Sequence, residues 1–311
     1  MQNKLSLSFA HAWPKLVDIL NKNISIAKNG TTVNKLIKRT ITGAVYVAVV
    51  VASLVWSLPY LYLAIFALTA ALGVNELHNL ASLEGQSTKA NLLIRIIDIV
   101  GSILIFASTA IATIKPGVDL VLCASLVTPW LLVRMISQIY IRNTNHIRDM
   151  ALSALAIVYV AAPLALLNIL YVRIGNEMLL ATFILLWVND TGAYCVGMPL
   201  GRHKLFPRIS PKKSWEGFWG GLVFCIIISL IFDYFGYYFG DMGIFYWIGF
   251  AIVVAVFATW GDLCESLIKR TVGAKDSSNL LPGHGGILDR IDSLLIVIPA
   301  IMIYITLFSL L

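Results

Sequence analysis

The chain has 311 residues, of which 59% are hydrophobic and only 13% are charged, and its mean hydropathy is +0.85. A soluble domain is about 45–50% apolar and about 25% charged, so this composition excludes an ordinary soluble domain, a disordered chain and a nucleic-acid-binding module. The remaining class is an integral membrane protein, in which the net charge of +7 indicates mainly which side of the membrane the cations face.

Residues 1–40 are predicted to form an N-terminal extension. Apolar residues such as Phe9, Trp13 and Leu20 recur at helical spacing among lysines, which is typical of an amphipathic helix in the membrane interface. Pro14 argues against one unbroken helix there. A leader without fixed structure is therefore the alternative prediction.

Nine apolar runs follow, and each is predicted to be a transmembrane helix, because lipid offers no water to unpaired backbone groups. The second run is the weakest, since Pro59 precedes it and Asn75-Glu76 are expected to end it, with Glu76 as an ordinary interface residue. Arg95 and Asp98 are expected to pair on one helix turn. The fold class is therefore an all-α polytopic membrane protein. The runs are 41–58, 60–75, 96–114, 117–134, 150–171, 178–197, 216–236, 243–262 and 290–311.

The cations alternate between the connecting segments in a way that predicts the orientation. With a cytoplasmic N-terminus, the cytoplasmic segments hold 21 of the 23 Lys and Arg residues. The opposite side holds only Lys115 and Arg173. This asymmetry follows the positive-inside rule and supports nine spans.

The segment 261–293 is the chemically densest part of the chain, with nine charged residues and five glycines in 33 positions. Asp289 and Asp292 are three residues apart and share a helix face where the last span begins. Opposed carboxylates are typical of a Mg²⁺ site, which also takes substrate phosphates. An acidic helix face precedes them, made by Asp262, Glu265, Ser266 and Lys269 at i, i+3, i+4 and i+7 spacing.

A glycine-rich loop, residues 281–286, lies between these two acidic faces and can turn the chain back. Its backbone N–H groups can hold phosphate oxygens. Each charged residue could instead belong to a solvated loop or form a salt bridge with a neighbour, without a role in a site. The nearby cations are Lys269, Arg270, Lys275 and Arg290.

Two further stretches are predicted to face the same side. Asp190 and Tyr194 are four residues apart near the end of the sixth span, and a carboxylate within a span is a candidate functional residue. Lys212 and Lys213 precede the seventh span, where lysines and helix N–H groups together favour an anion. Together these features predict a cytoplasm-facing, metal-assisted site for a phosphate-rich substrate.

Residues 266–292 resemble the motif of the phosphatidate cytidylyltransferase family, whose members are also called CDP-diacylglycerol synthases. The stretches NDTGAY, SPKKSWEG and GDLCES are similar to the same family, and the resemblance is firm over 180–300. The first six spans resemble the family only in size and hydropathy. The motif reads Ser266, Lys269-Arg270, Lys275-Asp276, Pro282, His284-Gly285-Gly286, Asp289-Arg290 and Asp292, without a departure.

This resemblance implies transfer of a cytidylyl group from CTP to phosphatidate, releasing pyrophosphate, at the cytoplasmic face of the inner (plasma) membrane. It implies Mg²⁺ as cofactor, with room for a second, monovalent cation such as K⁺, and it allows a homodimer. The implied domain division is an extension at 1–40, N-terminal helices at 41–175 and a catalytic region at 176–311. No nucleic acid is expected as a partner.

The resemblance also implies roles for individual residues. Asp262, Asp289 and Asp292 are implied as metal ligands. The implied catalytic residues are Asp190, Asp262, Lys269, His284 and Asp289. The implied substrate-binding residues are Lys212, Lys213, Ser266, Arg270, Lys275, Gly285, Gly286 and Arg290.

Two alternative functions remain open from the sequence. A CTP-dependent kinase of a polyprenol-type lipid would need a base to activate a hydroxyl group. A cation-coupled transporter would suit Asp190 and the acidic cluster, but an internal repeat is missing and most acids lie at span ends. Acyl-chain preference and the residue basis of cytosine selectivity do not follow from the sequence.

Overall fold

The computed structural model describes residues 43–45, 47–83, 89–114, 125, 127–141, 145–239, 242–280 and 285–310. Six helices in these ranges are long and apolar enough to cross a membrane. The predicted class, an all-α polytopic membrane protein, is thereby confirmed. The predicted extension at 1–40 lies outside the described residues.

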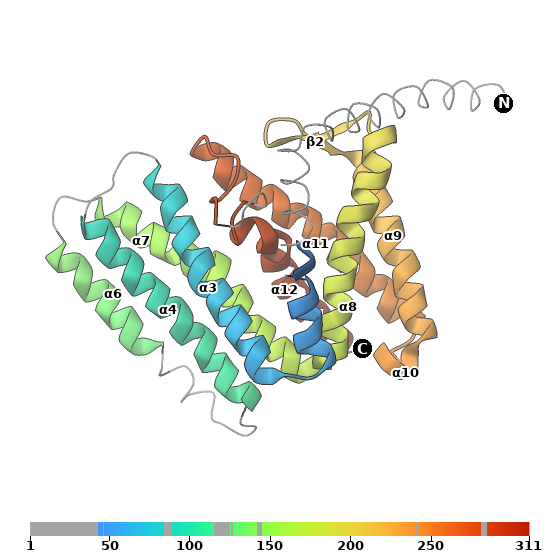
Figure 1. The fold of residues 1–311 in the computed structure, drawn as a ribbon, viewed down its shortest axis with the longest axis horizontal. Helices are drawn as coiled ribbons and strands as arrows, with labels where there is room; N and C mark the ends of the chain where they lie inside the picture. Colours follow the sequence, from blue (N-terminus) through green and yellow to red (C-terminus); the bar gives the residue numbers. More distant parts are fainter. Residues whose placement is uncertain are drawn as a thin grey trace.

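The described residues of the N-terminal half include the helices α3 (Pro59–Ser82), α4 (Lys89–Ile114), α6 (Thr128–Tyr140) and α7 (His146–Leu155). Figure 1 shows α3, α4 and α6 side by side as inclined rods. Before them, a shorter apolar helix covers Gly43–Val55, within the first predicted run. The fourth predicted run falls partly outside the described residues, so the count of nine spans stays a prediction.

Helix α3 is longer than the sequence predicted, because it runs through Asn75-Glu76 to Ser82. Its polar C-terminal third is largely buried and hydrogen-bonded to α4 and to the segment after α11, so it need not leave the protein interior. Pro59 stands in the first turn, where its missing N–H costs nothing.

A continuous run from His146 to Leu200 includes α7, the π-helix η1 (Ala156–Ala161) and α8 (Ala162–Leu200). Its 55 residues far exceed the roughly 20 that one bilayer crossing needs. The chain turns at Gly175, whose φ of 78° and ψ of 171° are non-helical and suit glycine. Gly175 lies between the predicted runs 150–171 and 178–197.

The C-terminal half contains a short hairpin and three long helices. Strands β1 (Lys204–Phe206) and β2 (Ser210–Ser214) pair antiparallel, with Lys204 opposite Ser214. The sequence predicted no strands here. The helices that follow are α9 (Trp215–Tyr234), the short α10 (Gly236–Phe239), α11 (Ile244–Thr271) and α12 (Leu288–Phe308).

Helices α8 and α9 approach closely because glycines line their contact. A Cβ on Gly220 would meet Val196, and a Cβ on Gly221 would lie 2.6 Å from Asn189 Oδ1. Gly197 and Gly217 face each other across the same seam. Small residues of this kind allow two membrane helices to pack backbone against backbone.

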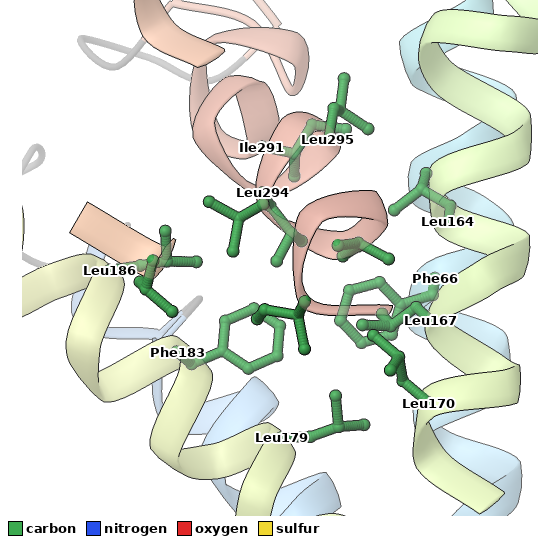
Figure 2. Packing of buried hydrophobic residues seen from close by; sticks show 14 of the residues in the cluster. Phe66, Leu164, Leu167, Leu170, Leu179, Phe183, Leu186, Ile291, Leu294 and Leu295 are labelled. Carbon is green, nitrogen blue, oxygen red and sulfur yellow. The ribbon is translucent and has the colours of Figure 1, made fainter. Parts of the chain in front are cut away.

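The apolar core joins the two halves of the chain. Figure 2 shows α12 side chains packed against α3 and against both arms of α8. Apolar side chains such as Val223 and Ile227 on α9 are instead half exposed, which is typical of a lipid-facing surface. The labelled core residues are Phe66, Leu164, Leu167, Leu170, Leu179, Phe183, Leu186, Ile291, Leu294 and Leu295.

One face of the molecule collects the ends that carry the candidate site. The C-terminal ends of α3, α8 and α11, the hairpin and the start of α12 all lie toward the top of Figure 1. Elements far apart in the sequence therefore present their polar ends to one region.

Candidate active site at the ends of α8, α11 and α12

A cavity of about 560 Å³ lies between the C-terminal part of α8, the hairpin, the start of α9 and α11. Its lining includes Asp190 from α8, Lys212 and Lys213 from β2, and Asp262 from α11. The structure therefore brings together four of the predicted site residues from three separate stretches of sequence. The cavity is large enough for a substrate of drug-like or nucleotide size.

The Lys213–Asp262 ion pair forms the wall between the hairpin and α11. Lys213 Nζ lies 2.7 Å from Asp262 Oδ2 and donates to the carbonyl of Thr259 at 3.3 Å. Ser266, one helical turn on, donates to Asp262 Oδ1 at 3.1 Å. Both charged side chains remain partly exposed, at 24% and 37%, so they are accessible to a substrate.

Lys213 takes this position because β2 leads directly into α9. Ser214 is the N-cap of α9, and its hydroxyl accepts from the Gly217 N–H at 3.2 Å. Glu216 accepts from the His203 backbone N–H and also contacts its ring Nδ1 at 2.7 Å, which fixes the base of the hairpin. Lys212 is exposed and lines the cavity, and its predicted role in anion binding stays a prediction.

Three carboxylates from three helices influence one another electrostatically: Asp190 of α8, Asp262 of α11 and Asp292 of α12. The positive charge of Lys213 attracts the carboxylates of both Asp190 and Asp292, and the charge of Arg290 also attracts Asp190. Asp292 Oδ1 accepts from the Ser293 N–H at 2.7 Å. In the described part of the chain, these acids do not close into a ready-made cluster of three metal ligands.

The donor chemistry of these carboxylates nevertheless fits Mg²⁺. This ion usually takes one or two carboxylates and fills its remaining positions with waters and substrate phosphates. Asp190 and Asp262 both line the cavity, where such phosphates could reach them. An all-protein cage is therefore not required.

Asp289 lies beside this group but is already engaged. Its Oδ2 accepts from the backbone N–H groups of Gly286 and Ser277, at 2.8 and 2.9 Å, and lies 2.9 Å from the Ser277 hydroxyl. Its Oδ1 accepts from Lys269 at 2.5 Å. A metal ion at Asp289 would have to take the place of Lys269 at Oδ1.

Lys269 is buried between two acids. Its Nζ lies 2.5 Å from both Glu265 Oε2 and Asp289 Oδ1, and the residue is only 7% exposed. Glu265 is fully buried. This arrangement places Lys269 as the link between α11 and α12, so any contact with a phosphate group would require it to leave a carboxylate.

The remaining predicted substrate-binding cations lie at the exposed edge. Arg270 donates to the carbonyls of Ile209 and Ala274, which ties the end of α11 to the hairpin. Lys275 and Arg290 are exposed. The predicted catalytic residue His284 lies outside the described residues, so its role stays a prediction.

The predicted phosphate-binding glycines pack closely against acids. Gly285 has a φ of 78°, and a Cβ there would collide with Asp289. The Gly286 N–H donates to Asp289, so in this conformation it is not free for a phosphate oxygen. Both positions therefore require glycine for close approach to a side chain.

Glu76 is a buried residue of this region that the sequence did not predict as part of the site. It was interpreted as an ordinary interface residue, yet its carboxylate accepts from Ser277, Ser278, Ile287 and Leu288. The signal that could have identified it is a lone acid in an otherwise apolar helix, since such residues persist in membranes only with partners.

A second polar cluster joins the N-terminal helices and corrects a further expectation. Arg95 and Asp98 were expected to pair on one turn, but Arg95 donates to Asn75 and Asn79 on α3. Asp98 instead contacts His78 at 3.0 Å and Arg134 at 3.4 Å. The cluster shares no residue with the cavity lining and links α3, α4 and α6.

The fold and site define a polytopic membrane protein with a cavity at one face in which acids and lysines from separate helices meet. This is the arrangement expected of a membrane enzyme that acts on an anionic substrate.

Comparison with known proteins makes the assignment specific. A model of the cytidylyltransferase family matches residues 37–308, and the chain belongs to this family. A protein from Staphylococcus aureus strain COL named phosphatidate cytidylyltransferase is 37% identical over 186 residues, covering 56% of this chain and 71% of the relative. Relatives with the same name from Haemophilus influenzae and Staphylococcus haemolyticus are 46% identical over 127 residues and 40% identical over 156 residues. These two alignments cover 40% and 47% of this chain, and 44% and 59% of the relatives.

Proposed function

We propose that this chain is a phosphatidate cytidylyltransferase, which converts CTP and phosphatidate to CDP-diacylglycerol and pyrophosphate in phospholipid biosynthesis. The observation that carries the proposal is the cavity lined by Asp190, Lys212, Lys213 and Asp262 in a membrane chain of the cytidylyltransferase family. Both substrates are anionic phosphates, and one is a lipid. A cavity with lysines at the end of membrane helices suits both properties.

In the proposed reaction, a phosphate oxygen of phosphatidate attacks the α-phosphorus of CTP. The new P–O bond forms as the bond between the α-phosphorus and its bridging oxygen to the β-phosphate breaks, and pyrophosphate leaves with that electron pair. No nucleophile from the protein is required, because the lipid phosphate is already an anionic oxygen nucleophile. The work of the protein is then positioning and charge stabilisation.

The lysines bind and orient the two substrates. Lys212 faces the cavity without a carboxylate partner among the described residues, so it is available for a phosphate group. Lys213 holds Asp262 in the free protein and can turn to a phosphate when the acid acquires another cation. Lys269 holds Asp289 and Glu265 in place.

Asp262, Asp292 and Asp190 are the acids best placed to hold Mg²⁺, and Asp289 joins them if Lys269 releases it. The ion supplies positive charge that offsets repulsion between the two anions and stabilises the leaving pyrophosphate. We include a second, monovalent cation and a homodimer as further expectations. We also place the enzyme in the inner membrane with this site facing the cytoplasm.

The fate of labelled phosphorus tests this function. Purified protein in detergent is incubated with Mg²⁺, with CTP labelled at either the α- or the γ-phosphate, and with either phosphatidate or a polyprenol as the acceptor. We expect the α-label in lipid and the γ-label in pyrophosphate. A γ-label in lipid would instead establish a CTP-dependent lipid kinase, and no transfer of either label would overturn both enzymatic proposals.

A further inference from the structure

The carboxylate of Glu76 on α3 has four hydrogen-bonding partners in the segment that leads from α11 into the first residue of α12. Oε1 accepts from the Ser278 hydroxyl at 2.7 Å and the Ile287 N–H at 2.9 Å. Oε2 accepts from the Leu288 N–H at 2.8 Å and lies 2.9 Å from the Ser277 hydroxyl, whose single proton it shares with Asp289. The residue is only 1% exposed, and its partners lie more than 200 positions away in the sequence.

Glu76 supplies a cap that the start of α12 does not have of its own. The N-cap residue of α12 is Ile287, whose side chain cannot accept a hydrogen bond. The first N–H groups of a helix lack intrahelical partners and carry partial positive charge. No Lys, Arg or His pairs with Glu76 among the described residues, so the helix terminus and the two serines take the place of a counter-charge.

The same contacts connect Glu76 to the acids of the candidate site. The Ser277 hydroxyl lies 2.9 Å from both Glu76 Oε2 and Asp289 Oδ2. A Cβ at Gly286 would collide with Ser277 and Glu76, so the backbone lies directly against the carboxylate. Asp289 and Asp292 stand in the first two turns of the helix whose terminus Glu76 holds.

Glu76 is itself held on a fixed support. Its neighbours Asn75 and Asn79 accept from Arg95 on α4, at 2.5 and 2.6 Å. His78 contacts Asp98, also on α4, at 3.0 Å. The end of α3 is therefore fastened to α4 on one side and to the start of α12 on the other.

We propose that Glu76 is a positioning residue, which sets the depth and direction of the first turn of α12 so that Asp289 and Asp292 face the cavity acids. This inference rests on the proposed cytidylyltransferase function of the site. Through α3, the N-terminal half of the chain would then help to position the acids of the catalytic half.

The test is the variant Glu76→Gln, measured in two independent ways. A glutamine keeps one acceptor oxygen and turns an N–H₂ group toward donors, so at least one pair of hydrogen bonds is lost. We expect faster backbone hydrogen exchange over residues 286–288 in the purified protein. We also expect kcat to fall about 10- to 100-fold, the usual effect of losing a residue that orients metal-binding acids. The Mg²⁺ concentration for half-maximal activity should rise, and KM for CTP should stay within about twofold.

The matched control is Asn168→Asp, which changes another fully buried polar side chain, one that donates to Phe106 and Thr109 on α4, and alters neither the support of Glu76 nor residues 277–288. We expect it to lower thermal stability and leave the Mg²⁺ dependence unchanged. Equal losses of kcat in both variants would overturn the proposal, because they would show general destabilisation. Faster exchange with normal kcat and Mg²⁺ dependence would also overturn it, by reducing Glu76 to a structural cap.

Failure of this inference is distinguishable from failure of the proposed function. An inactive wild-type protein would remove the function, whereas the exchange measurement reports on the cap without any turnover. If Glu76→Gln does not fold, Glu76→Asp keeps the charge on a shorter side chain and should show the same split between kcat and KM. A Glu76→Asp protein with wild-type exchange and Mg²⁺ dependence would contradict the proposal.

Discussion

At the scale of single residues, the Lys213–Asp262 pair shows how the site can be stable when empty and still open to substrate. A partly exposed ion pair contributes only about 0–1 kcal/mol of stability. Exchanging each partner for a substrate group or a metal ion therefore costs little. In the empty site, the two charges that are proposed to bind substrate and metal therefore neutralise each other.

Lys212 provides the simplest test of phosphate binding in the cavity. The substitution Lys212→Ala should raise KM for CTP or phosphatidate about tenfold, since a charge-assisted hydrogen bond contributes about 1.5 kcal/mol. Steady-state kinetics with each substrate varied in turn would measure this. Arg208→Ala, at an exposed hairpin position outside the cavity lining, is the control. An unchanged KM for both substrates would make Lys212 a residue of membrane topology only.

Asp289 is predicted to be essential for turnover but not for folding. In Asp289→Asn, one amide oxygen can still accept from Gly286 and Ser277, while the N–H₂ group faces Lys269 and no longer offers it a charge. Turnover should be lost and the protein should still fold and insert into the membrane, with a lowered thermal unfolding midpoint because the buried Lys269 loses one of its two acids. Asp233→Asn, toward the opposite end of α9, serves as the control. Near-normal turnover would remove Asp289 from the site.

At the scale of elements, the glycine seam between α8 and α9 determines where Asp190 stands relative to the hairpin. Asn189 and Asp190 are adjacent on α8, and Gly221 on α9 packs directly against Asn189. A side chain at Gly221 must therefore separate the helices or displace the part of α8 that lines the cavity.

The substitution Gly221→Leu should accordingly destabilise the protein by about 1–3 kcal/mol, the usual cost of overpacking. A lowered midpoint of thermal unfolding in detergent would reveal it. Val223→Leu, on the half-exposed face of the same helix, should leave the midpoint unchanged. Equal midpoints for both variants would mean that the seam tolerates separation.

The sequence predicted where the long helices lie but not all of the contacts between them. Hydropathy located the long helices, because a membrane helix must bury apolar side chains along about 20 residues. It placed the end of α3 too early, at Asn75-Glu76, because their partners Arg95 and Ser277-Ser278 lie elsewhere in the chain. Local spacing also suggested an Arg95–Asp98 pair, which the competing partners on α3 and α6 prevent.

The sequence predicted which residue types belong to the candidate site but not how their side chains pair. The acids and lysines that line the cavity lie in the stretches NDTGAY, SPKKSWEG and GDLCES, which the sequence singled out because residue types and spacing are local features. The sequence could not show that Lys269 is buried between Glu265 and Asp289, or that Glu76 reaches α12, since both depend on helix packing.

At the scale of the whole molecule, the charge asymmetry predicts which face meets the cytoplasm. In a cysteine-free background, Arg208→Cys in the hairpin should react with an impermeant thiol reagent only from the cytoplasmic side. Arg173→Cys, near the turn at Gly175, should react only from the opposite side. Labelling of intact cells and of inverted membrane vesicles would measure this, and reaction of both cysteines from one side would contradict the predicted topology.

The central claim is that the acid- and lysine-lined cavity catalyses cytidylyl transfer to a lipid phosphate. Its most direct test is pyrophosphate release by the purified protein with CTP, phosphatidate and Mg²⁺, each omitted in turn, and with Asp262→Asn in parallel. The account predicts release only when all three components are present, with the α-phosphate of CTP recovered in lipid and no release from the variant. Folded wild-type protein that releases no pyrophosphate under varied lipid and metal conditions, or an Asp262→Asn protein as active as the wild type, would contradict it.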